Sequence, residues 1–141
     1  MAYVPANRPR TPAPRRVAAV FARLLRIARK ASPGLRVVLR EGDARAFPET
    51  RNYAYCSSGR EGLTIVVAPR MALAALDRIE GVLMHEIAHA VFFAGGEEKH
   101  AEREADRLAE RLFGCTLRYD VQDAVQTTAA GTRPRPAYLP V

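Results

Sequence analysis

The feature that most constrains this chain is the pentapeptide His-Glu-Ile-Ala-His at residues 85–89, which lies in an otherwise apolar stretch. Between residues 81 and 94 the only polar side chains are His85, Glu86 and His89. A helix that is apolar on all sides is expected to be buried, and a buried polar group costs free energy unless a partner satisfies it. These three side chains therefore need partners inside the protein.

The spacing of the two histidines favours a shared metal ion. Residues at positions i and i+4 stack on one face of a helix, so His85 and His89 can reach the same ion, with Glu86 beside the water that the ion activates. The alternative is a chance match on a surface helix. Such a helix would carry Lys, Arg or Glu around its outer face, and residues 81–94 contain none except Glu86. The pattern predicts a zinc site with two histidine ligands and Glu86 as the general base.

A second helix is predicted to follow. Gly95-Gly96 is a strong helix terminator, and residues 97–113 then read as a helix that Gly114 ends. Its apolar residues follow the spacing of a buried stripe, which consists of Ala101, Ala105, Leu108 and Leu112. Glu102 and Asp106 flank this stripe, whereas His100 falls on the polar face.

The distance of each residue from the Gly95-Gly96 turn supplies a separate argument. If the two helices fold back antiparallel about Gly95-Gly96, Glu102 lies level with His89 and Asp106 level with His85. Face and depth together predict Glu102 as the third ligand, and Asp106 as the acceptor of a hydrogen bond from a ligand histidine. Two alternatives stay open: Glu102 is a solvated carboxylate paired with arginine, or His100 is the third ligand.

Two motifs, HEIAH at 85–89 and EREAD at 102–106, together resemble those of the gluzincin metallopeptidases, whose second motif reads E-x-x-A-[N/D]. The chain is most similar to the small ImmA/IrrE-like endopeptidases of bacteria and their mobile elements. The resemblance covers roughly residues 79–113. It implies a zinc metallo-endopeptidase with one zinc ion per chain, in which Glu102 is the third ligand.

The other elements predict an α+β fold. An amphipathic helix is expected at residues 14–31, and a short helical linker at about 70–75 should precede the metal helix. Strands are expected at residues 35–40, 52–57, 63–68 and 115–120, the second and third of them as a hairpin. This order resembles a minimal zincin-like domain with an N-terminal helix, a small mostly antiparallel sheet, the HExxH helix and a carboxylate-bearing helix.

In zincins a peptide substrate lies along an exposed edge strand of the sheet. The counterpart here is the predicted strand at residues 52–57, whose unpaired backbone groups would bind an extended chain. The residues expected to form this substrate-binding edge are Asn52, Tyr53, Ala54, Tyr55 and Cys56.

Length and composition bound the remaining possibilities. The 141 residues are enough for one domain, which we place at residues 14–126, between a flexible Pro/Arg-rich arm at 1–13 and a loose tail at 127–141. The sequence contains no apolar run long enough to span a membrane and does not start like a secretory signal. Two cysteines are too few for a disulfide scaffold. We therefore expect a cytoplasmic protein with free thiols.

The charge distribution offers an alternative function. The net charge is +7, and the first 40 residues hold ten basic and no acidic side chains. Such a segment could bind nucleic acid phosphates or an anionic membrane, with or without proteolysis. However, the segment lacks interleaved aromatic residues and a DNA-reading motif. The favoured interpretation is that its arginines solvate the outer face of a packed helix.

Overall fold

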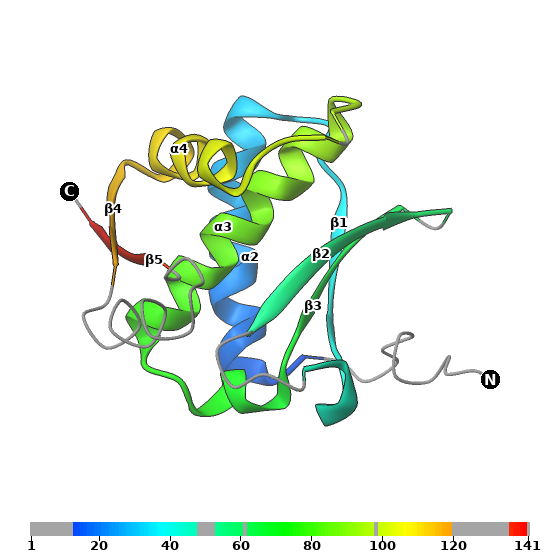
Figure 1. Cartoon of the computed structure of the whole chain (residues 1–141), viewed down its shortest axis with the longest axis vertical. Coiled ribbons are helices and arrows are strands. Elements are labelled where there is room, and N and C mark those ends of the chain that lie inside the picture. Colours follow the sequence, from blue (N-terminus) through cyan, green and yellow to red (C-terminus); the bar gives the residue numbers. More distant parts are fainter. Residues whose placement is uncertain (1–12, 48–52, 61, 98, 120–135, 141) are drawn as a thin grey trace.

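The computed structural model of the chain describes residues 13–47, 53–60, 62–97, 99–119 and 136–140. The chain forms an α+β fold, with helices packed beside a small sheet (Figure 1). None of the helices described is long and apolar enough to cross a membrane. In chain order the elements are α2 (Arg15–Ala31), β1 (Val37–Glu41), the 3-10 turn η1 (Ala44–Ala46), β2 (Ala54–Gly59), β3 (Gly62–Val67), the 3-10 turn η2 (Pro69–Leu73), α3 (Leu76–Ala94), α4 (Glu102–Phe113), β4 (Cys115–Tyr119) and β5 (Pro136–Pro140).

The main sheet has three strands in the order β1-β3-β2. Strands β2 and β3 form the predicted hairpin, in which Gly59 pairs with Gly62. β3 runs parallel to β1, so the sheet is mixed and not mostly antiparallel as predicted. The reason is the path of the chain: β2 takes the outer position, and the hairpin then brings β3 back beside β1 in the same direction.

Helix α2 packs its apolar face into the core, as its sequence pattern predicts. Its buried residues recur with helical spacing and are Val17, Val20, Phe21, Leu24, Leu25 and Ala28. Three of its arginines contact the protein itself. Arg16 donates hydrogen bonds to the carbonyl oxygens of Ala72 and Ala74, at 3.2 and 2.7 Å. Arg23 pairs with Glu80, and Arg29 donates to the Leu35 carbonyl at 2.9 Å.

These three arginines therefore hold helix α2 against neighbouring segments of the fold. The predicted arm at 1–13 lies outside the described residues except for its last residue, and the structure does not bear on it.

Helix α3 is the central element, and in Figure 1 it crosses in front of α2 with the three-stranded sheet to one side. Every residue from 81 to 90 is buried, because α3 packs against α2, α4, β2 and β3. The sheet contributes Val37, Leu39, Ile65 and Val67 to the same core. Full burial of this segment is what an all-apolar sequence requires, and it places the three polar residues of the pentapeptide inside the molecule.

Helix α4 is shorter than predicted. It begins at Glu102, whereas the sequence pattern suggested a start at residue 97. The chain turns at Gly96, whose φ of +84° suits glycine. The side chain of Glu104 accepts a hydrogen bond from the Ala101 N–H at 2.9 Å, which caps the helix at its observed start. The connection between α3 and α4 is therefore longer than the two-glycine turn assumed from the sequence, and Ala101 is exposed rather than buried.

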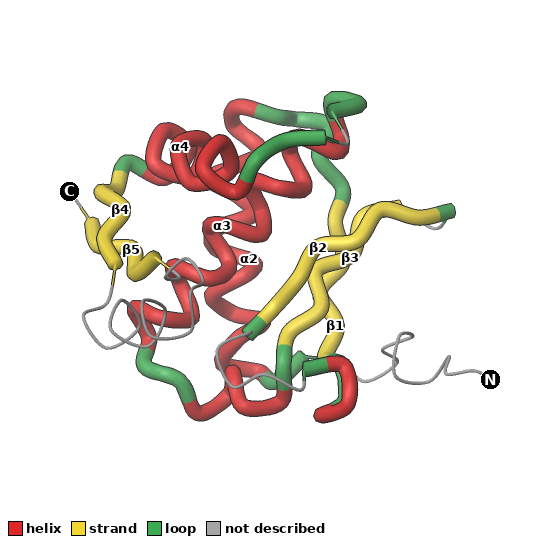
Figure 2. Tube along the Cα trace, in the orientation of Figure 1, coloured by secondary structure: helices red, strands yellow, loops and turns green. Residues whose placement is uncertain are grey.

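A second sheet joins the end of the chain to the rest of the fold (Figure 2). Strand β5 pairs antiparallel with β4, Cys115 lying opposite Pro140, and β5 also packs beside α3. Residues 136–140, which fall within the predicted loose tail at 127–141, thus form a strand. Prolines at both ends of β5 obscured it in the sequence, since proline is accepted in strands mainly at sheet edges.

Candidate metal centre

The central helix carries the histidine pair into the core. The exposed fraction is 2% for His85, 3% for Glu86 and 9% for His89. Because the two histidines are four residues apart on α3, their rings lie on the same face, with centroids 4.6 Å apart. The predicted partners for these buried polar groups come from the segment that follows α3.

Three potential ligand atoms converge at this face. The Nε2 atoms of His85 and His89 are 3.1 Å apart. The carboxylate of Glu102, at the start of α4, lies 2.8 Å from Nε2 of His85 through Oε1 and 3.2 Å from Nε2 of His89 through Oε2. These three residues could together hold a metal ion, and they are called the ligand group below.

A second carboxylate fixes the orientation of His85. Oδ1 of Asp106 lies 2.6 Å from Nδ1 of His85, and Asp106 is only 4% exposed. A carboxylate accepts hydrogen bonds, so Nδ1–H is the donor. In neutral imidazole this leaves Nε2 of His85 with a lone pair directed at Glu102. The predicted role of Asp106 as acceptor from a ligand histidine agrees with this contact.

The convergence of lone pairs and carboxylate oxygens requires a positive charge between them. One source is a proton. Burial alone would lower the pKa of His85, but hydrogen bonds to Asp106 and Glu102, together with the charge of Glu86, raise it from 6.5 to about 9. The contacts with His85 and His89 likewise lower the pKa of Glu102 well below its ordinary value. The other source is a metal ion, for which such a set of nitrogen and oxygen atoms is suited.

The exposure of Glu102 distinguishes it from the other members of the group. Its side chain is 64% exposed, against 3% for His85 and 11% for His89. The alternative that Glu102 is merely a solvated partner of arginine does not describe its observed contacts. Its carboxylate is therefore the member of the group that faces solvent.

His100 is not a member of the ligand group. Its Nε2 atom lies 2.6 Å from Nδ1 of His89, the ring nitrogen opposite the one that faces Glu102. His100 therefore contacts the far side of His89 and not the point where the ligand atoms converge. The sequence argument placed it on the polar face of a helix, because that helix was assumed to include residues 97–101.

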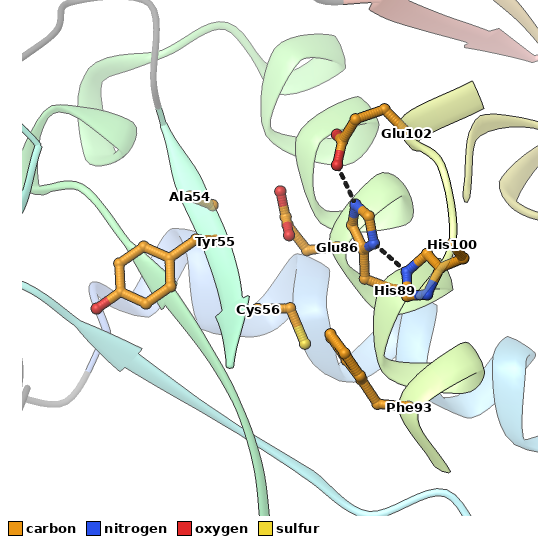
Figure 3. A pocket seen from close by; sticks show the side chains of 8 residues that line it. All are labelled: Ala54, Tyr55, Cys56, Glu86, His89, Phe93, His100 and Glu102. Atoms are coloured by element: carbon orange, nitrogen blue, oxygen red, sulfur yellow. Dashed lines mark hydrogen bonds and ion pairs between the residues drawn. The ribbon is translucent and has the colours of Figure 1, made fainter. Parts of the chain in front are cut away.

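A cavity of about 360 Å³ lies in front of the ligand group (Figure 3). Its lining consists of Ala54, Tyr55, Cys56, Glu86, His89, Phe93, His100 and Glu102. Figure 3 shows the carboxylate of Glu86 between His89 and strand β2, while Ala54 and Cys56 point toward it from the strand and Tyr55 points away. Glu86 thus lines the cavity without belonging to the ligand group, as the sequence predicts.

Strand β2 forms an edge of the three-stranded sheet within the described residues. The Ala68 N–H donates to the Tyr53 carbonyl at 2.7 Å, and hydrogen-bonded pairs alternate along an antiparallel ladder. The backbone groups of Tyr53 and Tyr55 therefore face β3, whereas those of Ala54 and Cys56 face the free edge. Of the predicted substrate-binding residues, Asn52 lies outside the described residues.

Comparison with protein-family models, with curated proteins and with solved structures finds no match for this chain.

Proposed function

We propose that the protein is a zinc-dependent metallopeptidase of the gluzincin type, which its two motifs resemble. The observation that carries the proposal is the convergence of His85, His89 and Glu102 beside a cavity that also contains Glu86 and an edge strand. Two imidazoles and a carboxylate are a common ligand set of catalytic zinc sites, in which one position is left for solvent or substrate.

The spacing of the ligand atoms fits zinc. Bonds of about 2.0–2.1 Å in a tetrahedral arrangement place ligand atoms about 3.3–3.4 Å apart. The two Nε2 atoms are 3.1 Å apart, and the Glu102 carboxylate lies 2.8 Å from Nε2 of His85 through Oε1 and 3.2 Å from Nε2 of His89 through Oε2. Small rotations of the side chains would bring one carboxylate oxygen and the two nitrogens to the spacing of a zinc site. A zinc ion held there would supply Lewis acidity, which lowers the pKa of water and polarises a carbonyl group.

Glu86 is the proposed general base. Its carboxylate is buried, and it follows His85 on the same helix, so it is held at a fixed place on the wall of the cavity. A base in this position can take a proton from the attacking water and return it to the leaving nitrogen of a peptide bond. Because Glu86 is separate from the ligand group, its replacement should leave metal binding in place.

The proposed substrate is an extended peptide that adds to strand β2. The free edge presents the backbone groups of Ala54 and Cys56, and both residues line the cavity that holds Glu86. A peptide paired with this edge would form backbone hydrogen bonds with β2. Those of its carbonyl groups that do not pair with β2 would be accessible to the ligand group. This mode of binding requires an extended peptide, and the backbone hydrogen bonds do not depend on its side chains.

Glu86→Gln tests the mechanism. Glutamine keeps the shape of the side chain but cannot accept the proton, so zinc content should persist while peptide hydrolysis falls by about 10²- to 10⁴-fold. Cleavage is measured on a proteome-derived peptide library by mass spectrometry, since this requires no knowledge of the substrate. The matched control is Glu80→Gln on the same helix, which removes only the partly exposed ion pair with Arg23. Equal cleavage by wild type and Glu86→Gln would contradict the mechanism.

A further inference from the structure

The contacts of His100 define its protonation pattern and that of His89. Nδ1 of His100 lies 3.0 Å from the carbonyl oxygen of Glu97, and a carbonyl can only accept, so Nδ1 carries the proton. In a neutral imidazole the other nitrogen is then an acceptor. With His100 neutral, its Nε2 accepts a hydrogen bond from Nδ1–H of His89, 2.6 Å away. This leaves Nε2 of His89 without a proton on the side that faces Glu102.

The ring of His100 is held by two aromatic neighbours. Phe92 stacks on it with a centroid distance of 4.5 Å and an interplanar angle of 25°. Phe93 meets it edge-on at 5.2 Å and 69°. Both phenylalanines belong to the last turn of α3, and the chain reverses at Gly96 to bring His100 back against them. The ring is thus fixed by packing as well as by its two hydrogen bonds.

The two ligand histidines consequently have different hydrogen-bond partners at Nδ1. Nδ1 of His85 donates to the carboxylate of Asp106, whereas Nδ1 of His89 is hydrogen-bonded to the imidazole of His100. Groups in this outer position set the tautomer and the orientation of a ligand histidine, and their loss typically weakens metal binding about 10- to 100-fold. Neither motif of the sequence contains His100, which comes from the connection between the two helices.

We propose that His100 is a positioning residue for the metal centre. Through the chain Glu97 carbonyl–His100–His89, it holds His89 in the tautomer that presents Nε2 to the metal. The inference rests on the proposed zinc site, but the tautomer of His89 is a property of the protein that can be measured without metal.

Two substitutions separate the hydrogen bond from the packing. In His100→Gln the side-chain oxygen takes the place of Nε2 and can still accept from His89. In His100→Asn the shorter amide keeps a donor for the Glu97 carbonyl but cannot reach His89. His100→Phe keeps the aromatic packing with no acceptor at all, and Lys99→Gln is an exposed control in the same connection.

Zinc affinity is measured by competition with a chromophoric chelator, and the His89 tautomer by ¹⁵N chemical shifts of the metal-free full chain. We expect His100→Asn and His100→Phe to bind zinc about 10- to 100-fold more weakly. His100→Gln should stay within about fivefold of wild type, and Lys99→Gln should not change. His89 should carry its proton on Nδ1 in wild type and His100→Gln, and should lose this preference in the other two variants.

Each contrary result has a distinct meaning. Equal zinc affinity in all variants would overturn the positioning role, as would a wild-type His89 that carries its proton on Nε2. A wild-type protein that binds no zinc would overturn the proposed function instead. In that case the ¹⁵N shifts of His89 alone would decide whether His100 fixes the tautomer.

Discussion

Replacing Glu102 with alanine removes the one proposed ligand, among the described residues, that comes from outside helix α3. Its carboxylate is the group that lies within 2.8 and 3.2 Å of the two ligand nitrogens. Zinc sites with four protein ligands bind with about 10–16 kcal/mol, which corresponds to about 2.5–4 kcal/mol for each ligand. At about 1.4 kcal/mol for each tenfold change, Glu102→Ala should weaken zinc binding by about 10²- to 10³-fold.

The chain offers a matched control two residues away. Glu104 is also exposed and also lies in the first turn of α4, but its carboxylate caps the helix by accepting from the Ala101 N–H. Glu104→Ala should therefore cost about 0.5–1.5 kcal/mol of stability, the contribution of one hydrogen bond, and leave zinc affinity within a few-fold of wild type.

The assay is a zinc titration against a competing chelator, with thermal unfolding of each metal-free variant measured alongside. We expect the two variants to separate: Glu102→Ala loses affinity and Glu104→Ala loses stability. The argument from geometry is refuted if Glu102→Ala keeps wild-type affinity while Glu104→Ala or His100→Ala releases the metal.

Three further outcomes follow from single contacts. Asp106→Asn keeps an acceptor for His85 but removes the charge, and zinc affinity should fall about 10- to 100-fold in the same titration. Burial, and to a lesser extent the charge of Glu86, raises the pKa of Cys56 from 9.0 to about 12. Its thiolate population near pH 8 is thus about a thousandfold lower than usual, and iodoacetamide should label it far more slowly in the native protein than in urea. Gly114 ends α4 with φ +61°, so Gly114→Ala should lower stability by about 1–2 kcal/mol in a thermal melt.

Much of the site could be predicted because helical spacing fixes it. The i, i+4 relation of His85 and His89 follows from the sequence alone. The contacts of Glu102 and Asp106 with them depend only on a chain reversal after α3 and on the spacing of residues 102 and 106 along the next helix. These predictions do not depend on the exact path of the connection, since Glu102 and Asp106 lie on one helix and their relative position is fixed by its geometry.

The role of His100 could not be predicted in the same way. The helix-face argument assumed that residues 97–101 were helical, because Ala101 continues the apolar stripe of Ala105, Leu108 and Leu112. In the structure the capping contact of Glu104 sets the start of α4, and the aromatic packing of His100 holds the preceding residues outside the helix. Such tertiary contacts override local propensity and leave no periodic signal in the sequence.

The sheet shows a similar division. The hairpin of β2 and β3 was predicted from alternating residues around a glycine-rich turn, and it is confirmed. The parallel pairing of β1 with β3 joins segments that are distant along the chain. Local patterns carry no information about such pairing, which depends on how the helices cover the sheet.

The metal content of the purified protein tests the central claim most directly. After dialysis against a weak chelator, elemental analysis of the wild-type chain should find one zinc ion per molecule, and His85→Ala and His89→Ala should each contain almost none. A wild-type protein without any tightly bound divalent ion, or a His85→Ala variant that retains zinc, would contradict the proposed metal centre.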